Sequence, residues 1–155
     1  VISRASLSVR FSHVNFTARW RFGFLLVYMA LVFIALGGAL GSVLRYWVMA
    51  HITRFLGLGF PYGTLTVNVA GALCMGMLIV GFARAASVPP FIQAFFTVGV
   101  LGGFTTFSTF SLDVATLIER GDLSFALLYI VASVMGSIGA IFIGLVVGRQ
   151  LFAVV

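Results

Sequence analysis

The chain has 155 residues, of which 62% are hydrophobic and only 8% are charged, and its net charge of +6 comes from arginine, since the sequence contains no lysine. A soluble domain of this size shows far more charge to water, so the composition predicts an integral membrane protein. One cysteine cannot form a disulfide within the chain. The arginines are scattered at the ends of apolar segments, which argues against the clustered basic face of a nucleic-acid-binding protein.

Residues 1–28 differ from the rest, because they hold four arginines and no acidic residue. They lack the short apolar run and cleavage site of a signal peptide. The chain begins with Val1, and Met29 opens a long apolar run. One hypothesis is therefore that translation starts at or near Met29, with residues 1–28 an untranslated or disordered extension and residues 29–155 the membrane domain. The alternative is a basic juxtamembrane segment on anionic lipid.

Four charge-free stretches each exceed the ~20 residues that cross a bilayer. They are Phe22–Leu44, Phe55–Ala83, Ala85–Leu112 and Leu123–Gly148. The polar joints between them are Arg45–Arg54, Arg84–Pro90 and Asp113–Asp122. We therefore predict an all-α membrane protein with four transmembrane helices and with both termini on one side.

The arginines at the ends of these spans indicate how the chain inserts. If the chain starts at Met29, Arg84 and Arg149 lie on the side of the termini, and Arg45, Arg54 and Arg120 lie on the other. Two against three is no bias under the positive-inside rule, so the chain should insert in either direction. With residues 1–28 retained, six against three favours a cytoplasmic N-terminus.

The first span contains Gly37 and Gly41 at four-residue spacing, which is typical of close helix packing in membranes. The glycines do not form a phosphate-binding loop, since no Lys-Ser/Thr follows them. Arg45 ends this predicted span. It is either an interface anchor whose charge snorkels to the headgroups or a charge that draws anions toward a pore mouth.

In the second span, Asn68 lies on one helix face with Thr64. An asparagine in lipid needs partners. It either bonds across a helix interface or lines a water-filled path, and the sequence leaves both interpretations open.

The third span is interrupted by polar residues, Gly-Gly-Phe-Thr-Thr-Phe-Ser-Thr-Phe, from Gly102 to Phe110. Non-helical backbone at membrane depth survives only when it packs in protein or lines a polar cavity. We therefore predict a break here that exposes carbonyl groups, next to Phe107 and Phe110 on one helix face. Phenylalanine in a membrane helix usually faces lipid or packs against protein, but its ring edge is positive and suits a small anion.

In the fourth span, small residues every four positions predict a helix-contact stripe; these are Gly136, Ala140, Gly144 and Gly148. Tyr129, Ser133 and Ser137 run beside the stripe, also at four-residue spacing. The serines either bond back to their own helix or form a polar track with the tyrosine.

The span cores hold no acidic residue, lysine or histidine. Neither a catalytic triad nor a carboxylate pair has candidates, so we do not expect an enzyme.

Three segments resemble the Fluc fluoride channels, also called the CrcB or camphor-resistance family. They are Gly37–Tyr46, Gly63–Gly71 and Gly102–Ser111, in that order, and the resemblance covers about Ala30 to Gly148. It does not reach residues 1–28.

The resemblance implies a dual-topology homodimer of two antiparallel subunits in the inner (plasma) membrane, with fluoride pores at the subunit contacts. The pore residues that it implies are Asn68, Phe107, Ser108, Thr109 and Phe110, with Tyr129 and Ser137 assigned by their position on the last span. It also implies a structural sodium ion (Na+) at the dimer centre, held by the backbone carbonyls of Gly102 and Thr105. Arg45 would attract anions at the vestibule.

The function that the resemblance implies is passive export of toxic fluoride from the cytoplasm. One departure is Asp113, where the family usually has Glu. Two other classes were weighed. A small multidrug-type exporter would need a carboxylate in its first span, which is absent. A non-transporting structural membrane subunit would explain the glycine stripes but not the polar set around Asn68.

Overall fold

The computed structural model describes residues 16–153, with side chains from residue 25 onward. Three helices are continuous, α1 (Phe16–Leu56), α2 (Tyr62–Arg84) and α6 (Leu123–Leu151). The third span is built from four shorter pieces, α3 (Pro90–Ala94), the π-helix η1 (Phe95–Leu101), α4 (Gly102–Phe104) and α5 (Phe107–Glu119).

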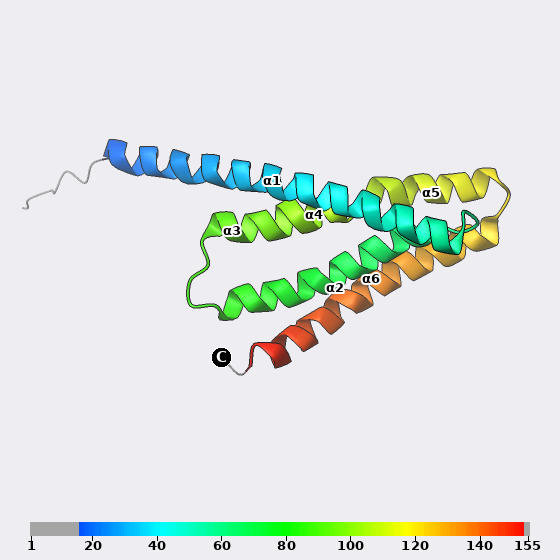
Figure 1. The fold of residues 1–155 in the computed structure, drawn as a ribbon. Coiled ribbons are helices and arrows are strands. Elements are labelled where there is room, and N and C mark those ends of the chain that lie inside the picture. The colour runs from blue at the N-terminus through cyan, green and yellow to red at the C-terminus, as the bar shows by residue number, and fades with distance from the viewer. Residues whose placement is uncertain (1–15, 154–155) are drawn as a thin grey trace, which may run out of the picture.

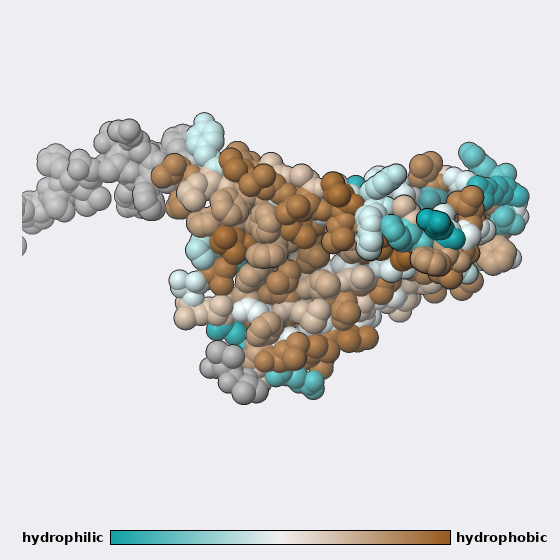
Figure 2. All heavy atoms as spheres, in the orientation of Figure 1, coloured by the Kyte–Doolittle hydropathy of each residue, from teal (hydrophilic) through white to brown (hydrophobic). Residues whose placement is uncertain are grey.

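Four apolar segments are long enough to cross a membrane, namely Leu25–Leu56, Tyr62–Arg84, Pro90–Glu119 and Leu123–Leu151. This confirms the prediction of an all-helical, four-span membrane protein. The spans run alternately up and down, so that the first turns of α1 and the end of α6 lie at the same end of the bundle (Figure 1). Hydrophobic side chains cover its length, and hydrophilic ones gather at the opposite end (Figure 2).

The predicted joint Arg45–Arg54 is wrong, because α1 continues as a helix to Leu56 and the loop is Gly57–Pro61. The predicted joint at Asp113 also begins too early, since α5 continues to Glu119. Charged residues were taken as span ends in both places. In the structure both Arg45 and Asp113 lie on helices and bond to polar groups of another span, which removes the need to leave the membrane.

Glycines bring the spans into backbone contact in two pairs. Between α1 and the third span, an added Cβ on Gly41 would overlap the carbonyl oxygen of Val100. Between α2 and α6, an added Cβ on Gly144 would overlap the carbonyl oxygen of Leu73. The predicted contact stripe of α6 is confirmed, since it packs on α2 along its length.

The buried core lies between α5 and α6. Its members are Phe110, Leu117, Ala126 and Tyr129, with Phe60 packed against them.

The predicted extension falls partly outside the described residues, which begin at residue 16. Residues 16–28 belong to α1, and the helix continues through the proposed domain boundary at residues 28 and 29. The start at Met29 stays a prediction.

Candidate functional site

The third span contains two residues with extended backbone between α4 and α5. They are Thr105 (φ −85°, ψ 157°) and Thr106 (φ −153°, ψ 121°). Gly102 keeps helical angles (φ −64°, ψ −37°). The threonines, and not the glycines before them, leave the helical conformation.

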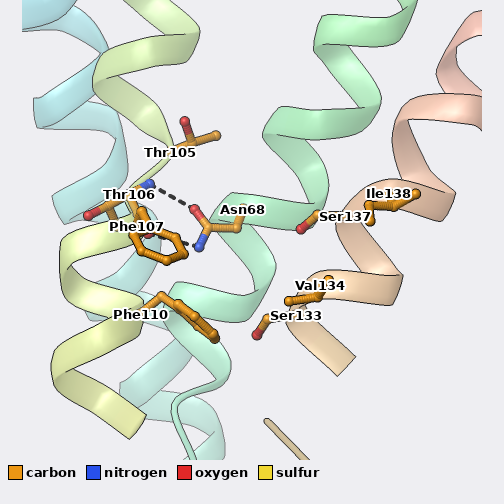
Figure 3. A pocket seen from close by; sticks show the side chains of 9 residues that line it. All are labelled: Asn68, Thr105, Thr106, Phe107, Phe110, Ser133, Val134, Ser137 and Ile138. Carbon is orange, nitrogen blue, oxygen red and sulfur yellow. Dashed lines mark hydrogen bonds between the residues drawn. The ribbon is translucent and has the colours of Figure 1, made fainter. Parts of the chain in front are cut away.

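Asn68 of α2 satisfies the backbone of Thr106. Its Oδ1 accepts a hydrogen bond from the Thr106 N–H at 2.8 Å, and its Nδ2 donates to the Thr106 carbonyl at 3.0 Å (Figure 3). Both backbone groups would otherwise lack a partner at membrane depth. The side-chain amide carries two hydrogens, so one of them remains available.

The Thr106 side chain caps α5. Its hydroxyl accepts from the Thr109 N–H at 3.2 Å and also bonds the hydroxyls of Thr109 at 3.1 Å and Ser108 at 3.2 Å. The sequence placed Ser108 and Thr109 in the pore. The structure places their hydroxyls in this cap, and neither residue lines the hollow described next.

A hollow of about 340 Å³ opens beside the Asn68–Thr106 pair. It is lined by Asn68, Thr105, Thr106, Phe107, Phe110, Ser133, Val134, Ser137 and Ile138 (Figure 3). It therefore brings together four of the predicted pore residues: Asn68, Phe107, Phe110 and Ser137. The rings of Phe107 and Phe110 lie 5.4 Å apart between centroids. Phe110 is nearly buried, whereas Phe107 is 78% exposed.

Ser133 was noticed in the sequence as part of the Tyr129–Ser137 track but was not selected as a site residue. Its side chain is 5% exposed, and its Oγ has no hydrogen-bond partner in the described chain. An unpaired buried hydroxyl is costly. Since Ser133 lines the hollow, its hydroxyl marks a place where a ligand or water can bond. The four-residue spacing was the signal that identified it.

Tyr129 lies behind the wall of the hollow. It is fully buried, packs on Phe110 at 5.2 Å between ring centroids, and donates a hydrogen bond to Asp113 Oδ2 at 3.1 Å. Thr64 and Ser133 are its other polar neighbours. Asp113, despite its short side chain, thus reaches the last span. It also lines a second, smaller hollow of about 210 Å³ with Arg120, toward the loop end of the bundle.

Arg45 lies at the interruption of the third span. Its Nη1 donates to the Thr105 carbonyl at 3.3 Å, and the side chain is half-buried. The interface-anchor interpretation placed it at the membrane surface. The structure places it beside a residue that lines the hollow.

Among the described residues, no group of three or more His, Cys, Asp or Glu side chains lies together to hold a metal ion. Any cation near the interruption would therefore depend on backbone oxygens.

Four apolar spans, an interrupted third span and an enclosed set of hydroxyl, amide and phenyl groups define a multi-pass membrane protein with a polar site at membrane depth. Comparison with known families assigns residues 32–145 to "CrcB-like protein, Camphor Resistance (CrcB)". The chain belongs to the CrcB family.

Curated relatives agree. The chain is 51% identical over 121 residues to the fluoride-specific ion channel FluC of Chelativorans sp. (strain BNC1), covering 78% of this chain and 97% of that one. It is 49% identical over 119 residues to FluC of Agrobacterium fabrum, covering 77% and 95%. It is 51% identical over 120 residues to FluC of Paracoccus denitrificans, covering 77% and 94%.

Proposed function

We propose that this protein is a fluoride-selective channel of the inner (plasma) membrane that lowers cytoplasmic fluoride by passive electrodiffusion. The relatives that carry this name match almost their whole length. The observation that carries the proposal to specific residues is the hollow at Asn68, which collects uncharged donors and phenyl rings at membrane depth.

The lining suits a small, strongly hydrated anion. The free hydrogen of the Asn68 amide and the hydroxyls of Ser133 and Ser137 replace water as donors, and the edges of Phe107 and Phe110 add weak positive potential. None of these groups is charged, so the ion binds weakly enough to leave again. Ser108, Thr109 and Tyr129 support this wall from behind through the α5 cap and the packing on Phe110.

Arg45 adds a positive charge next to the lining. It holds the Thr105 carbonyl, and Thr105 lines the hollow. In a low-dielectric surrounding, a cation at this position raises the local concentration of anions. We therefore assign Arg45 the role of attracting fluoride, although it lies deeper than a vestibule at the loop.

A second copy of the chain completes the pore. The hollow lies open on the single chain, and Phe107 exposes 78% of its surface there. Lipid on that side would offer the ion no donors. We propose that an antiparallel partner covers it, which gives a dual-topology homodimer with the interrupted third spans near its centre.

Sodium binding at that centre is supported by two carbonyls that lose their helical donors. The ordinary donor to the Gly102 oxygen is the Thr106 N–H, which bonds Asn68 instead. The ordinary donor to the Thr105 oxygen is the Thr109 N–H, which bonds the Thr106 hydroxyl. Carbonyl oxygens at the end of a helix suit a small cation. The residues present therefore fit Na+, with Gly102 and Thr105 of each copy as its ligands.

Fluoride efflux from liposomes that hold the purified protein tests this function, with chloride as the control. We expect selective fluoride efflux, and Phe110→Ile should reduce it at least ~10-fold because the ring edge is lost from the wall. Phe96→Ile is the matched control, since Phe96 lies in the same span but away from the hollow. Wild-type flux from Phe110→Ile would reject the pore assignment. No flux from the wild-type protein would favour the structural-subunit alternative.

A further inference from the structure

Helix α1 is much longer than a membrane span requires. Its 41 residues correspond to about 60 Å, whereas the hydrocarbon core is about 30 Å thick. The segment apolar enough to cross begins at Leu25. The N-terminal turns of α1 run on past α3 and the end of α2 (Figure 1). These turns therefore lie beyond the membrane core, on the side of the termini.

The N-terminal part of the chain is basic. Arg19 and Arg21 lie on the helix a few residues before Leu25, Arg10 and Arg4 precede them, and no acidic residue occurs before Asp113. Positive charges within about 15–20 residues of a span end are the ones that set orientation. Because the helix is continuous from Phe16, Arg19 and Arg21 are held close to the membrane surface.

The structure also changes the charge count at the other end of the bundle. Arg45 lies within α1, eleven residues before its end at Leu56, and bonds the third span, so it does not belong to the loop. Arg54 and Arg120 remain on the loop side. Arg84 and Arg149 lie at the ends of α2 and α6 on the side of the termini.

The membrane domain alone is therefore balanced, with two arginines at each end. The four arginines of residues 1–28 make the count six against two. An excess of this kind favours the cytoplasmic side, where the anionic leaflet attracts basic segments.

We propose that the basic N-terminal part of α1 fixes this chain in one orientation, with both termini in the cytoplasm. In the antiparallel assembly, which rests on the proposed function, the inverted copy would then come from a chain that lacks this charge, such as one that starts at Met29.

Reporter fusions at the C-terminus test the orientation directly and do not depend on fluoride conduction. Green fluorescent protein fluoresces only in the cytoplasm, and alkaline phosphatase is active only outside it. For the full chain we expect the cytoplasmic signal to exceed the outer one at least ~10-fold. Changing Arg4, Arg10, Arg19 and Arg21 to glutamine should bring the two signals within about twofold of each other.

Two controls separate charge from other effects. Lysine at the same four positions should preserve the single orientation, because the rule depends on charge and not on the guanidinium group. Arg54→Gln in the full chain should also leave it unchanged, since the excess only grows. Equal signals from the full chain, or a single orientation that survives the four glutamines, would overturn the proposal.

If the glutamine variant is degraded, the opposite change decides. Leu58 and Gly59 are exposed in the loop between α1 and α2. Arginine at both positions of the full chain should raise the inverted fraction at least ~3-fold. An unchanged fraction would overturn the proposal. Fluoride flux measured separately on the same proteins shows whether the proposed function holds, whatever the orientation.

Discussion

The two halves of the third span are held by different means. Before Thr105, η1 and α4 pack on α1 through glycines that allow backbone to touch backbone, as at Gly37 and Gly99. After Thr105, α5 packs on α6, and hydrogen bonds from Asn68 and Tyr129 join it to the neighbouring spans. The first half is fixed by shape and leaves no room. The second half depends on polar partners, and the hollow opens there.

The largest effect is expected in the glycine-packed half. Gly41→Ala puts a Cβ onto the Val100 carbonyl oxygen and 2.9 Å from the Phe104 N. Because backbone cannot move aside cheaply, we expect a loss of about 3 kcal/mol, seen as a large fall in the thermal unfolding temperature in detergent. Gly38→Ala, which meets no atom within 4 Å in the single chain, is the control. Equal stability of the two variants would contradict the importance of this contact.

Asn68→Ala should produce the next largest effect, in the hydrogen-bonded half. It removes the partner of both backbone groups of Thr106, which is itself buried. Each unpaired group costs roughly 1–3 kcal/mol, so both stability and fluoride flux should fall. The sequence alone suggested that flux would fall with assembly intact, and the two bonds to Thr106 are the reason to expect more. Thr66→Ala, on the same helix and exposed, should change neither quantity. A stable Asn68→Ala protein would show that water replaces the amide.

A smaller effect is expected for Arg45→Gln. The bond to the Thr105 carbonyl is long, at 3.3 Å, and the side chain is half-buried, so the stability loss should be about 1 kcal/mol. Fluoride flux should fall a few-fold, and its dependence on ionic strength should weaken, since an attracting charge is lost. Arg54→Gln, at the exposed end of α1, should affect flux less. The opposite order would assign the attraction to the loop.

The smallest change in stability is expected for Ser133→Ala. Its hydroxyl is buried without a partner, so its removal should alter stability by less than ~0.5 kcal/mol or increase it. Fluoride flux should nevertheless fall severalfold if the hydroxyl serves the ion. Ser111→Ala is the control, because that hydroxyl bonds its own helix at Phe107. Unchanged flux in both variants would exclude Ser133 from the conduction path.

Hydropathy and small-residue spacing predicted the four spans and the contact stripe of α6, because both properties are local. The partners of the polar residues were not predictable in this way. Arg45 was taken as a span end because its acceptor, the Thr105 carbonyl, lies 60 residues away. The sequence left Asn68 between an interface bond and a polar path, and the structure shows it in both positions.

Spacing was a weaker guide to depth than to direction. Tyr129, Ser133 and Ser137 share one face of α6, yet Tyr129 is buried behind Phe110 while the two serines reach the hollow. The ring of Phe110, from another span, makes this difference. Similarly, glycine content pointed to Gly102 as the place where the helix ends, whereas the backbone leaves it at Thr105.

The side chain of Asn68 presents one donor and one acceptor to Thr106, as a neighbouring peptide group in a β-sheet would. Aspartate and leucine match its size but lack one or both of these groups, and glutamine is longer by one methylene. Saturation mutagenesis of this position, under selection for growth in fluoride, should therefore recover asparagine almost alone. The lipid-facing positions of the same helix should accept many apolar residues.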